Sequence, residues 1–315
     1  MTDYIVKVGN FNQSCIESAL NTELYFDSAN CSYDDLHPNK AEVERTRRNY
    51  WGVLNDKGQY SYDFSIIPSF GFLADSLPLV KNVELKLSFD RANGNVGALK
   101  WSEETNLASL DTPLEITNCH AITEWVSSPS LRSFFDGIDL NPIVYKFEEA
   151  EVVVRTLEKD VDSIRIDAVK GGNLPSYIFA GIIPQTSLGG TLDSCSTEFN
   201  QHGVVRFNLT IDGQSVNGYP IEVSNPSRVF PLAKFLDTTS RLLNVDAAKT
   251  QGVNTFKHNY LWSHKFEVEK SSSGWIGIDF KLAEAYKDTM CIVIWLISPC
   301  ALSIDKHNDI EFIRL

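Results

Sequence analysis

The sequence predicts an all-β protein built from two tandem eight-stranded antiparallel jelly-roll sandwiches, a double jelly roll, with one short helix in the second. Three observations lead to this prediction. Residues 203–212 alternate between apolar and polar side chains, which is the period of a strand with one buried face. Apolar segments recur between turn residues at the spacing of a β-sandwich series. Residues 231–243 are the one segment with convincing helical spacing, with a predicted apolar face of Ala233, Leu236, Leu242 and Leu243.

The composition indicates a globular protein with a buried core. The 315 residues suffice for one large β domain or two domains of about 150 residues. Hydrophobic residues make up 43% of the chain, and the mean hydropathy is −0.15. A net charge of −13 disfavours direct binding of nucleic acid, because phosphate contacts need clustered Lys and Arg. The same charge would keep a self-assembling protein soluble before assembly.

The compartment is expected to be intracellular. The N-terminus has no apolar signal segment, and the longest apolar run, residues 291–297, is too short to cross a bilayer. We therefore expect no secretion and no membrane span. The cysteines show no C-x-x-C pair and are expected to be reduced. They are Cys15, Cys31, Cys119, Cys195, Cys291 and Cys300.

The boundary between the two jelly rolls is predicted in the polar stretch 157–162, which places the first at residues 1–157 and the second at residues 158–315. Just before it, the extended segment 145–156 contains three consecutive valines, which predicts a strand buried on both faces. The other elements expected in the first jelly roll are strands at 4–8, 23–26, 60–67, 83–89 and 114–117, a charged helix at 39–49 and a helical turn at 130–135.

The second jelly roll is expected to begin with strands at 163–169 and 177–184. Gly171-Gly172 between them can take the positive φ angles that reverse a strand. Asp212-Gly213 predicts a hairpin, followed by a strand at 218–223. The later elements are expected as the helix at 231–243, a loop at 247–256, a hairpin loop at 271–274, and strands at 260–269, 274–282, 289–297, 301–305 and 310–314.

The most hydrophobic of these strands is predicted to be fully buried. Residues 290–297 are all apolar without alternation, which is expected where both faces of a strand are covered. One cover should be the opposing sheet, and the other the helix at 231–243 or a neighbouring subunit. Pro299 is expected to end this strand, because proline is excluded from central ladders.

No catalytic, metal or cofactor site is predicted, and we expect a protein that is not an enzyme. Phosphate-loop and nucleophile-elbow motifs are absent from the sequence. His258 and His264 lack a third ligand nearby. The carboxylates Glu148, Glu149 and Glu151 are interpreted as a solvated edge rather than the opposed pair of a glycosidase. The group Thr117, Asn118, His120 and Glu124 is interpreted as ordinary loop, and the basic patch Arg45, Arg47 and Arg48 as a solvated helix face.

Three tryptophans leave one alternative open. Trp262, Trp275 and Trp295 fall in the predicted strands of the final sheet. Buried, they would be core residues, which we favour; exposed, they would indicate a sugar-binding face. The competing hypotheses are therefore a carbohydrate- or protein-binding β-sandwich and, less favoured, a hydrolase on a jelly-roll scaffold.

Residues 60–315 resemble the double jelly-roll capsid proteins of Polinton/Maverick elements and adintovirus-like viruses. Five stretches carry the resemblance. They are LPLVKNVELKLSFDRA (77–92), YKFEEAEVVVRTL (145–157), GGNLPSYIFAGIIP (171–184), VVRFNLTIDGQSVNGYPIE (204–222) and the apolar segment 290–304. In that family the first of them belongs to the first jelly roll, and LPSYIFAGIIP and FNLTIDG belong to the second.

The resemblance implies a structural capsid subunit that trimerises into a pseudo-hexameric capsomer of an icosahedral shell. The implied partners are neighbouring capsomers and a penton or minor capsid protein, and the implied location is the virion, reached from the cytoplasm or nucleus of a host. Major capsid proteins of this family are usually longer. A compact variant, a truncated or domesticated copy, and a penton-like minor capsid protein therefore remain open.

Overall fold

The computed structural model describes mainly the C-terminal half of the chain. The described residues are 142–169, 173–188, 199–218, 220–223, 229–243, 260–266, 273–305, 307 and 309–314, together with 53–54, 60–61, 86 and 129. Strands dominate this part, which confirms the all-β class. Of the elements expected before residue 140, the start of 60–67 is described, where β2 (Tyr60–Ser61) pairs antiparallel with β1 (Val53–Leu54). Of the strand expected at 83–89 only Lys86 is described, and it is not in a strand. The others lie outside the described residues.

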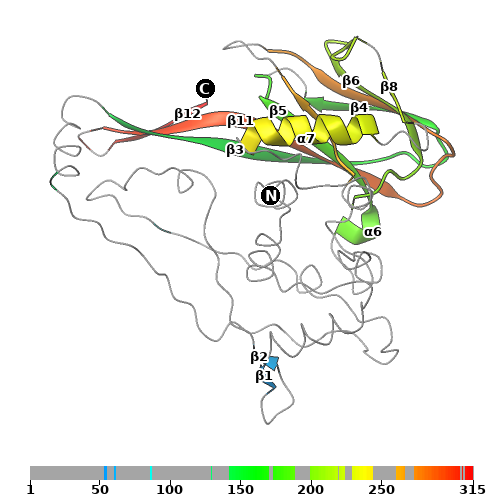
Figure 1. Cartoon of the computed structure of the whole chain (residues 1–315), viewed down its shortest axis with the longest axis horizontal. Helices are drawn as coiled ribbons and strands as arrows, with labels where there is room; N and C mark the ends of the chain where they lie inside the picture. The colour runs from blue at the N-terminus through cyan, green and yellow to red at the C-terminus, as the bar shows by residue number, and fades with distance from the viewer. Residues whose placement is uncertain are drawn as a thin grey trace.

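Two five-stranded antiparallel sheets form the described C-terminal unit (Figure 1). We call them the β11 sheet and the β10 sheet. The β11 sheet contains β3 (Ile143–Thr156), β5 (Tyr177–Pro184), β9 (Trp262–Lys265), β11 (Met290–Ile304) and β12 (Ile310–Arg314). The β10 sheet contains β4 (Ser163–Val169), β6 (Val204–Ile211), β7 (Gln214–Ser215), β8 (Ile221–Glu222) and β10 (Ile276–Leu282).

The strand order is that of a jelly roll. Apart from the hairpin strand β7 and the terminal β12, eight strands follow one another along the chain. The first, eighth, third and sixth (β3, β11, β5 and β9) pair in that order in one sheet. In the other sheet β4, the second strand, pairs with β10, which pairs with β6, and β6 pairs with β8. The described half is therefore one eight-stranded jelly roll. The first predicted jelly roll falls mostly on residues outside the described part.

Two connections predicted to reverse the chain within a hairpin cross between sheets instead. The Gly171-Gly172 connection joins β4 to β5, and the connection at residues 271–274 joins β9 to β10, yet each pair of strands is divided between the two sheets. Turn residues indicate where a strand ends, but not which strand it pairs with. The Asp212-Gly213 prediction is confirmed: both residues have positive φ (51° and 83°), and β6 pairs with β7 across them.

The long strand β3 belongs with the C-terminal strands, because it pairs with β11 along its whole length, from Cys291↔Thr156 to Ile304↔Ile143. A division after residue 157 would separate these two hydrogen-bonded strands. The predicted burial of β3 on both faces is wrong: Val152 and Val154 are 41% and 42% exposed. In the described part of the chain β3 lies at the edge of its sheet, and these two side chains are exposed there.

The prediction of full burial is confirmed for Met290–Ile297 in β11. However, the strand continues past Pro299 to Ile304. The carbonyls of Thr289 and Ile297 accept hydrogen bonds from Gln185 and Ser176, at the two ends of β5. Because alternate residues direct their backbone groups to the same side, Pro299 faces that side too. There it lies between the last β5 pair, at Ile297, and the first β12 pair, at Cys300, so its missing N–H removes no ladder bond.

Both faces of the β11 sheet are covered over its central part. On the inner face, Trp262 of β9 stacks on Phe207 of the β10 sheet, with ring centroids 4.9 Å apart. On the outer face, Phe199 packs edge-on against Trp295 at 5.2 Å. A Cβ at Gly181 would lie 2.5 Å from Phe199, so this position admits only glycine without rearrangement.

The helix α7 (Val229–Leu243) completes the outer cover (Figure 1) and confirms the predicted helix, two residues longer at its start. Phe235 on α7 contacts Phe179 of β5, with ring centroids 6.1 Å apart. The predicted apolar face is partly wrong, because Ala233 is exposed and Leu236 is only half-buried. The buried face consists of Leu232, Phe235, Thr238 and Thr239. A second, four-residue helix, α6 (Gln185–Leu188), follows β5 and was not predicted.

Candidate functional site

Beyond the end of β5, three strands continue as a narrow extension of the β11 sheet. It consists of residues 143–149 of β3, residues 298–304 of β11, and β12. Figure 1 shows these strands projecting to one side of the sandwich, away from α7. We consider this extension as the candidate functional site because it combines a buried thiol and a partly exposed ion pair with exposed apolar side chains.

The end of the extension farthest from β5 is apolar on its inner face. Ile143, Tyr145 and Ile304 are buried on it. On β12, Ile310 and Phe312 of the same face remain exposed, and the Phe312 ring lies 6.0 Å from that of Phe147. The inner face therefore carries an apolar surface at the far end of the extension.

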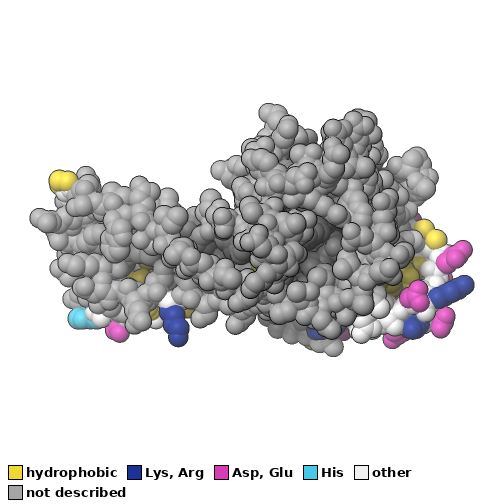
Figure 2. All heavy atoms as spheres, turned by 90° about the horizontal axis from the view of Figure 1, so that it is seen from below, with side chains coloured by type: hydrophobic (Ala, Val, Ile, Leu, Met, Phe, Trp, Pro, Cys, Tyr) yellow, Lys and Arg dark blue, Asp and Glu magenta, His cyan; other side chains and the backbone are white. Residues whose placement is uncertain are grey.

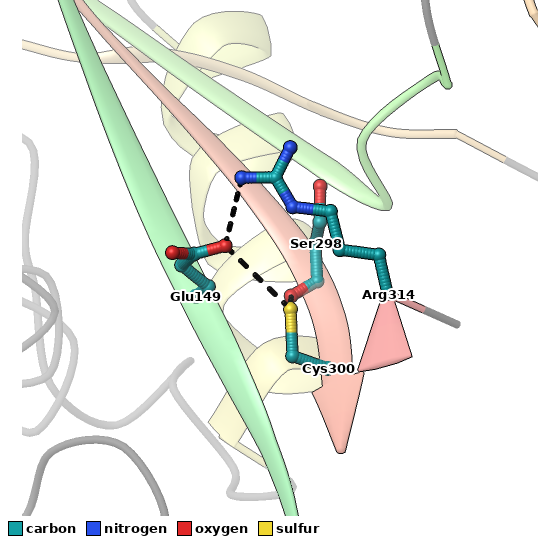
Figure 3. Close-up of polar contacts among 4 residues, drawn as sticks. All are labelled: Glu149, Ser298, Cys300 and Arg314. Atoms are coloured by element: carbon teal, nitrogen blue, oxygen red, sulfur yellow. Dashed lines mark hydrogen bonds and ion pairs between the residues drawn. The ribbon is translucent and has the colours of Figure 1, made fainter. Parts of the chain in front are cut away.

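A polar cluster joins the three strands of the extension (Figure 3). Arg314 of β12 donates from Nη2 to Glu149 Oε2 of β3 at 3.0 Å. The buried Cys300 thiol of β11 lies 3.7 Å from the same carboxylate oxygen and 3.7 Å from the Ser298 carbonyl. Burial, followed by the charge of Glu149, raises the pKa of Cys300. The thiol is therefore neutral near pH 7 and donates a hydrogen bond rather than acting as a nucleophile.

Sequence reasoning missed this cluster. Cys300 and Arg314 lie 151 and 165 residues from Glu149, and only the pairing of β3, β11 and β12 brings them together. No spacing motif in the sequence carries that information.

The three glutamates of β3 differ from the solvated edge that we predicted. Glu148 is half-buried, and burial raises its pKa to about 7. Glu149 forms the ion pair with Arg314, and Glu151 is exposed as expected. Because successive side chains of a strand point to opposite faces, Glu148 lies on one face of the sheet and the other two on the opposite face. They do not form the facing pair that glycoside hydrolysis needs.

His264 lines a cleft between α7 and the two sheets, with a volume of only about 10 Å³, room for about one water molecule. Burial, followed by the charge of Lys234, lowers the pKa of His264 to about 4, so the imidazole is neutral near pH 7. The cleft is smaller than most small-molecule sites. Within the described residues no cluster of His, Cys, Asp and Glu has the arrangement of a metal site. His258, the other predicted member of the pair, lies outside them.

The tryptophans do not form one exposed platform. Trp262 and Trp295 are buried in the β11 sheet, as favoured from the sequence. Trp275 is 58% exposed and precedes β10 in the other sheet, where its backbone N–H donates to the Asp212 carboxylate at 2.9 Å. The sugar-binding alternative required Trp262 and Trp275 to be exposed together, and the burial of Trp262 contradicts it.

Several candidates singled out from the sequence fall on residues that are not described, so their interpretations stay predictions. These are the basic patch Arg45, Arg47 and Arg48, the group Thr117, Asn118, His120 and Glu124, and the cysteines at 15, 31, 119 and 195. Cys291 and Cys300 are free and buried. No helix in the described part of the chain is long and apolar enough to span a membrane.

The described unit defines the class of protein, an eight-stranded jelly-roll β-sandwich. No family model matches the chain, and no curated protein matches it. Solved structures similar to it include the mavirus major capsid protein, at 11% identity, with a TM-score of 0.34 over 60% of this chain and 44% of that chain. Another is PBCV-1 VP54 fitted into a reconstruction of the virophage Sputnik, at 9% identity, with a TM-score of 0.38 over 60% and 55%. The chain spans about half the length of each.

Proposed function

We propose that this protein is a structural capsid subunit that trimerises into pseudo-hexameric capsomers of an icosahedral shell. Its partners are then other copies of itself, neighbouring capsomers, and a penton or minor capsid protein. Its final location is the virion, after synthesis inside a host cell. The proposal rests on the resemblance of the sequence to double jelly-roll capsid proteins of Polinton/Maverick elements and adintovirus-like viruses.

One observation carries the proposal: four of the five stretches that resemble this family, those in the described part of the chain, contain strands of one jelly roll. LPSYIFAGIIP supplies β5, FNLTIDG supplies β6 and its turn, and residues 290–304 supply β11. For LPSYIFAGIIP and FNLTIDG, the family resemblance implies strands of the second jelly roll. The jelly-roll strand order was found independently of the resemblance.

The ionisable side chains agree with a structural role. The thiol of Cys300 is held neutral by burial and by Glu149, and the imidazole of His264 is neutral near pH 7. Neither group has the protonation state of an activated nucleophile or a general acid.

The domain organisation is proposed with a changed boundary. We predicted jelly rolls at residues 1–157 and 158–315, and the proposal keeps two units. Because β3 pairs with β11, the proposed boundary moves to a position before Ile143. Residues before it would supply the first jelly roll, including the stretch 77–92.

Light scattering coupled to size exclusion, at increasing protein concentration, tests the assembly state. The proposal expects a particle of three times the 35.3 kDa chain mass. A monomer at every concentration, with no lattice under any assembly condition, would count against it. A five-fold particle would instead favour the penton-like alternative.

A further inference from the structure

The edge of β3 that faces away from β11 includes residues 150–156. In the part of the chain that the structure describes, no strand pairs with this edge. The Leu157 N–H donates to the Met290 carbonyl, and this bond sets the alternation along the β3–β11 ladder. The odd-numbered residues of β3 therefore bond to β11, while Ala150, Val152, Val154 and Thr156 direct their backbone N–H and C=O groups outward.

The side chains of this edge are partly apolar and carry both signs of charge. Val152 and Val154 lie exposed on the outer face of the sheet, on the side of α7. Glu151 and Arg155 are exposed on the opposite face. The guanidinium of Arg155 donates to the Val154 carbonyl at 3.1 Å, so one outward carbonyl is already satisfied by a side chain.

The order of these residues makes the edge complementary to itself. If two copies pair antiparallel about a two-fold axis at Val153, each Val152 lies opposite a Val154, and each Glu151 lies opposite an Arg155. The residues with outward backbone groups then face one another, as ladder bonds require. Apolar and opposite-charge pairs across strands both stabilise a sheet. We propose that residues 150–156 form an isologous two-fold contact with a second copy of this chain, which extends the β11 sheet across the axis.

The alternative interpretation is that the charges of Glu151 and Arg155 protect the edge from pairing with another strand. Natural edge strands often carry charged residues to prevent pairing. Protection does not require opposite charges at positions that match under a two-fold axis, whereas such matched charges stabilise self-pairing. In the paired state the Val154 carbonyl accepts from the backbone of the second copy, and Arg155 is released to meet Glu151.

The contact goes beyond the proposed capsid function and does not depend on it. If the chain forms trimers, the edge joins two of them; if it does not, the edge joins two monomers. Trimers without the contact would leave the capsid proposal standing and overturn this one. Two-fold pairs without trimers would overturn the capsid proposal and leave this one standing.

Cysteine cross-linking tests the register. Val153→Cys places a thiol on the axis, where paired residues are close enough for a disulfide. Under mild oxidation this variant should give a cross-linked dimer on a non-reducing gel, well above the unsubstituted chain. Arg165→Cys, exposed on β4, is the matched control. Cross-linking no greater than in that control overturns the contact, and stronger cross-linking by Val152→Cys overturns the register.

A charge exchange tests the contact without cysteine chemistry. Glu151→Arg or Arg155→Glu alone puts like charges opposite each other twice, and each should weaken the two-fold association at least about tenfold in sedimentation equilibrium. The double variant, E151R with R155E, should restore it. Arg165→Glu should leave it unchanged. A double variant as weak as either single variant overturns the pairing.

Discussion

Glu148 and Glu149 are neighbours in the sequence but lie on opposite faces of β3, and the two faces give them different chemistry. Glu149 meets Arg314 and Cys300 on the inner face. Glu148 is half-buried on the outer face, where burial raises its pKa to about 7. The sequence alone predicts that the two side chains lie on opposite faces. Their long-range partners and the extent to which each side chain is buried come only from the folded sheet.

Glu148 should make the stability of the protein depend on pH. Its pKa is about 7 in the folded protein, against an ordinary value of 4.5 for a glutamate in water, so the folded state binds the proton more tightly. The free energy of unfolding should therefore fall as pH rises from 4.5 to 7. With solvent screening, the change is about 2 kcal/mol. Thermal melts of the parent chain and Glu148→Gln across this range should diverge, with the variant flatter. Parallel curves would contradict the assignment.

Ile294 lies at the centre of the buried strand and is fully buried. Ile294→Asp places an unpaired charge in the core, which costs several kcal/mol out of a domain stability of about 5–15 kcal/mol. The variant should be insoluble or melt far below the parent. Val144→Asp, an exposed position of the same sheet, should melt close to the parent. An unchanged melting temperature for Ile294→Asp would show that the core is misplaced.

At the scale of elements, local pattern located strands better than it located their partners. Three of the predicted strands, 163–169, 177–184 and 310–314, have the bounds that the structure gives them. Alternation and turn residues are local signals, so they define where a strand begins and ends. Pairing in a jelly roll is non-local, and consecutive strands enter different sheets, which explains the two misassigned hairpins. The predicted strand end at Pro299 is wrong because this proline lies between the last pair with β5 and the first pair with β12, where a missing N–H removes no ladder bond. Local sequence does not show where those pairs fall.

The helix α7 offers a test of the outer cover. Phe235 is fully buried against Phe179, whereas Phe230 on the same helix is exposed. Phe235→Ala should lower the free energy of unfolding by about 3–5 kcal/mol, through lost burial and the cavity it leaves. Phe230→Ala should cost far less. Urea unfolding of both variants measures the difference, and equal losses would mean that α7 does not cover the sheet as described.

At the scale of the whole molecule, the charged side chains of the described residues that are visible from below lie mainly toward the two ends of the view (Figure 2). The class of fold could be predicted from strand period and turn spacing, and the jelly roll of the C-terminal half bears it out. The polar cluster of the extension could not be predicted, because its members come from β3, β11 and β12. The proposed position of the boundary depends on β3, whose partner β11 lies at the other end of the unit.

Negative-stain electron microscopy of the purified chain tests the central claim, a capsid subunit, most directly. The proposal predicts particles with a pseudo-hexagonal outline, and closed shells or flat lattices of these particles under assembly conditions. Arg155→Glu should keep the individual particles and weaken contacts between them. A field of single-copy particles, with neither capsomers nor lattices at any concentration or salt, would contradict the proposed function.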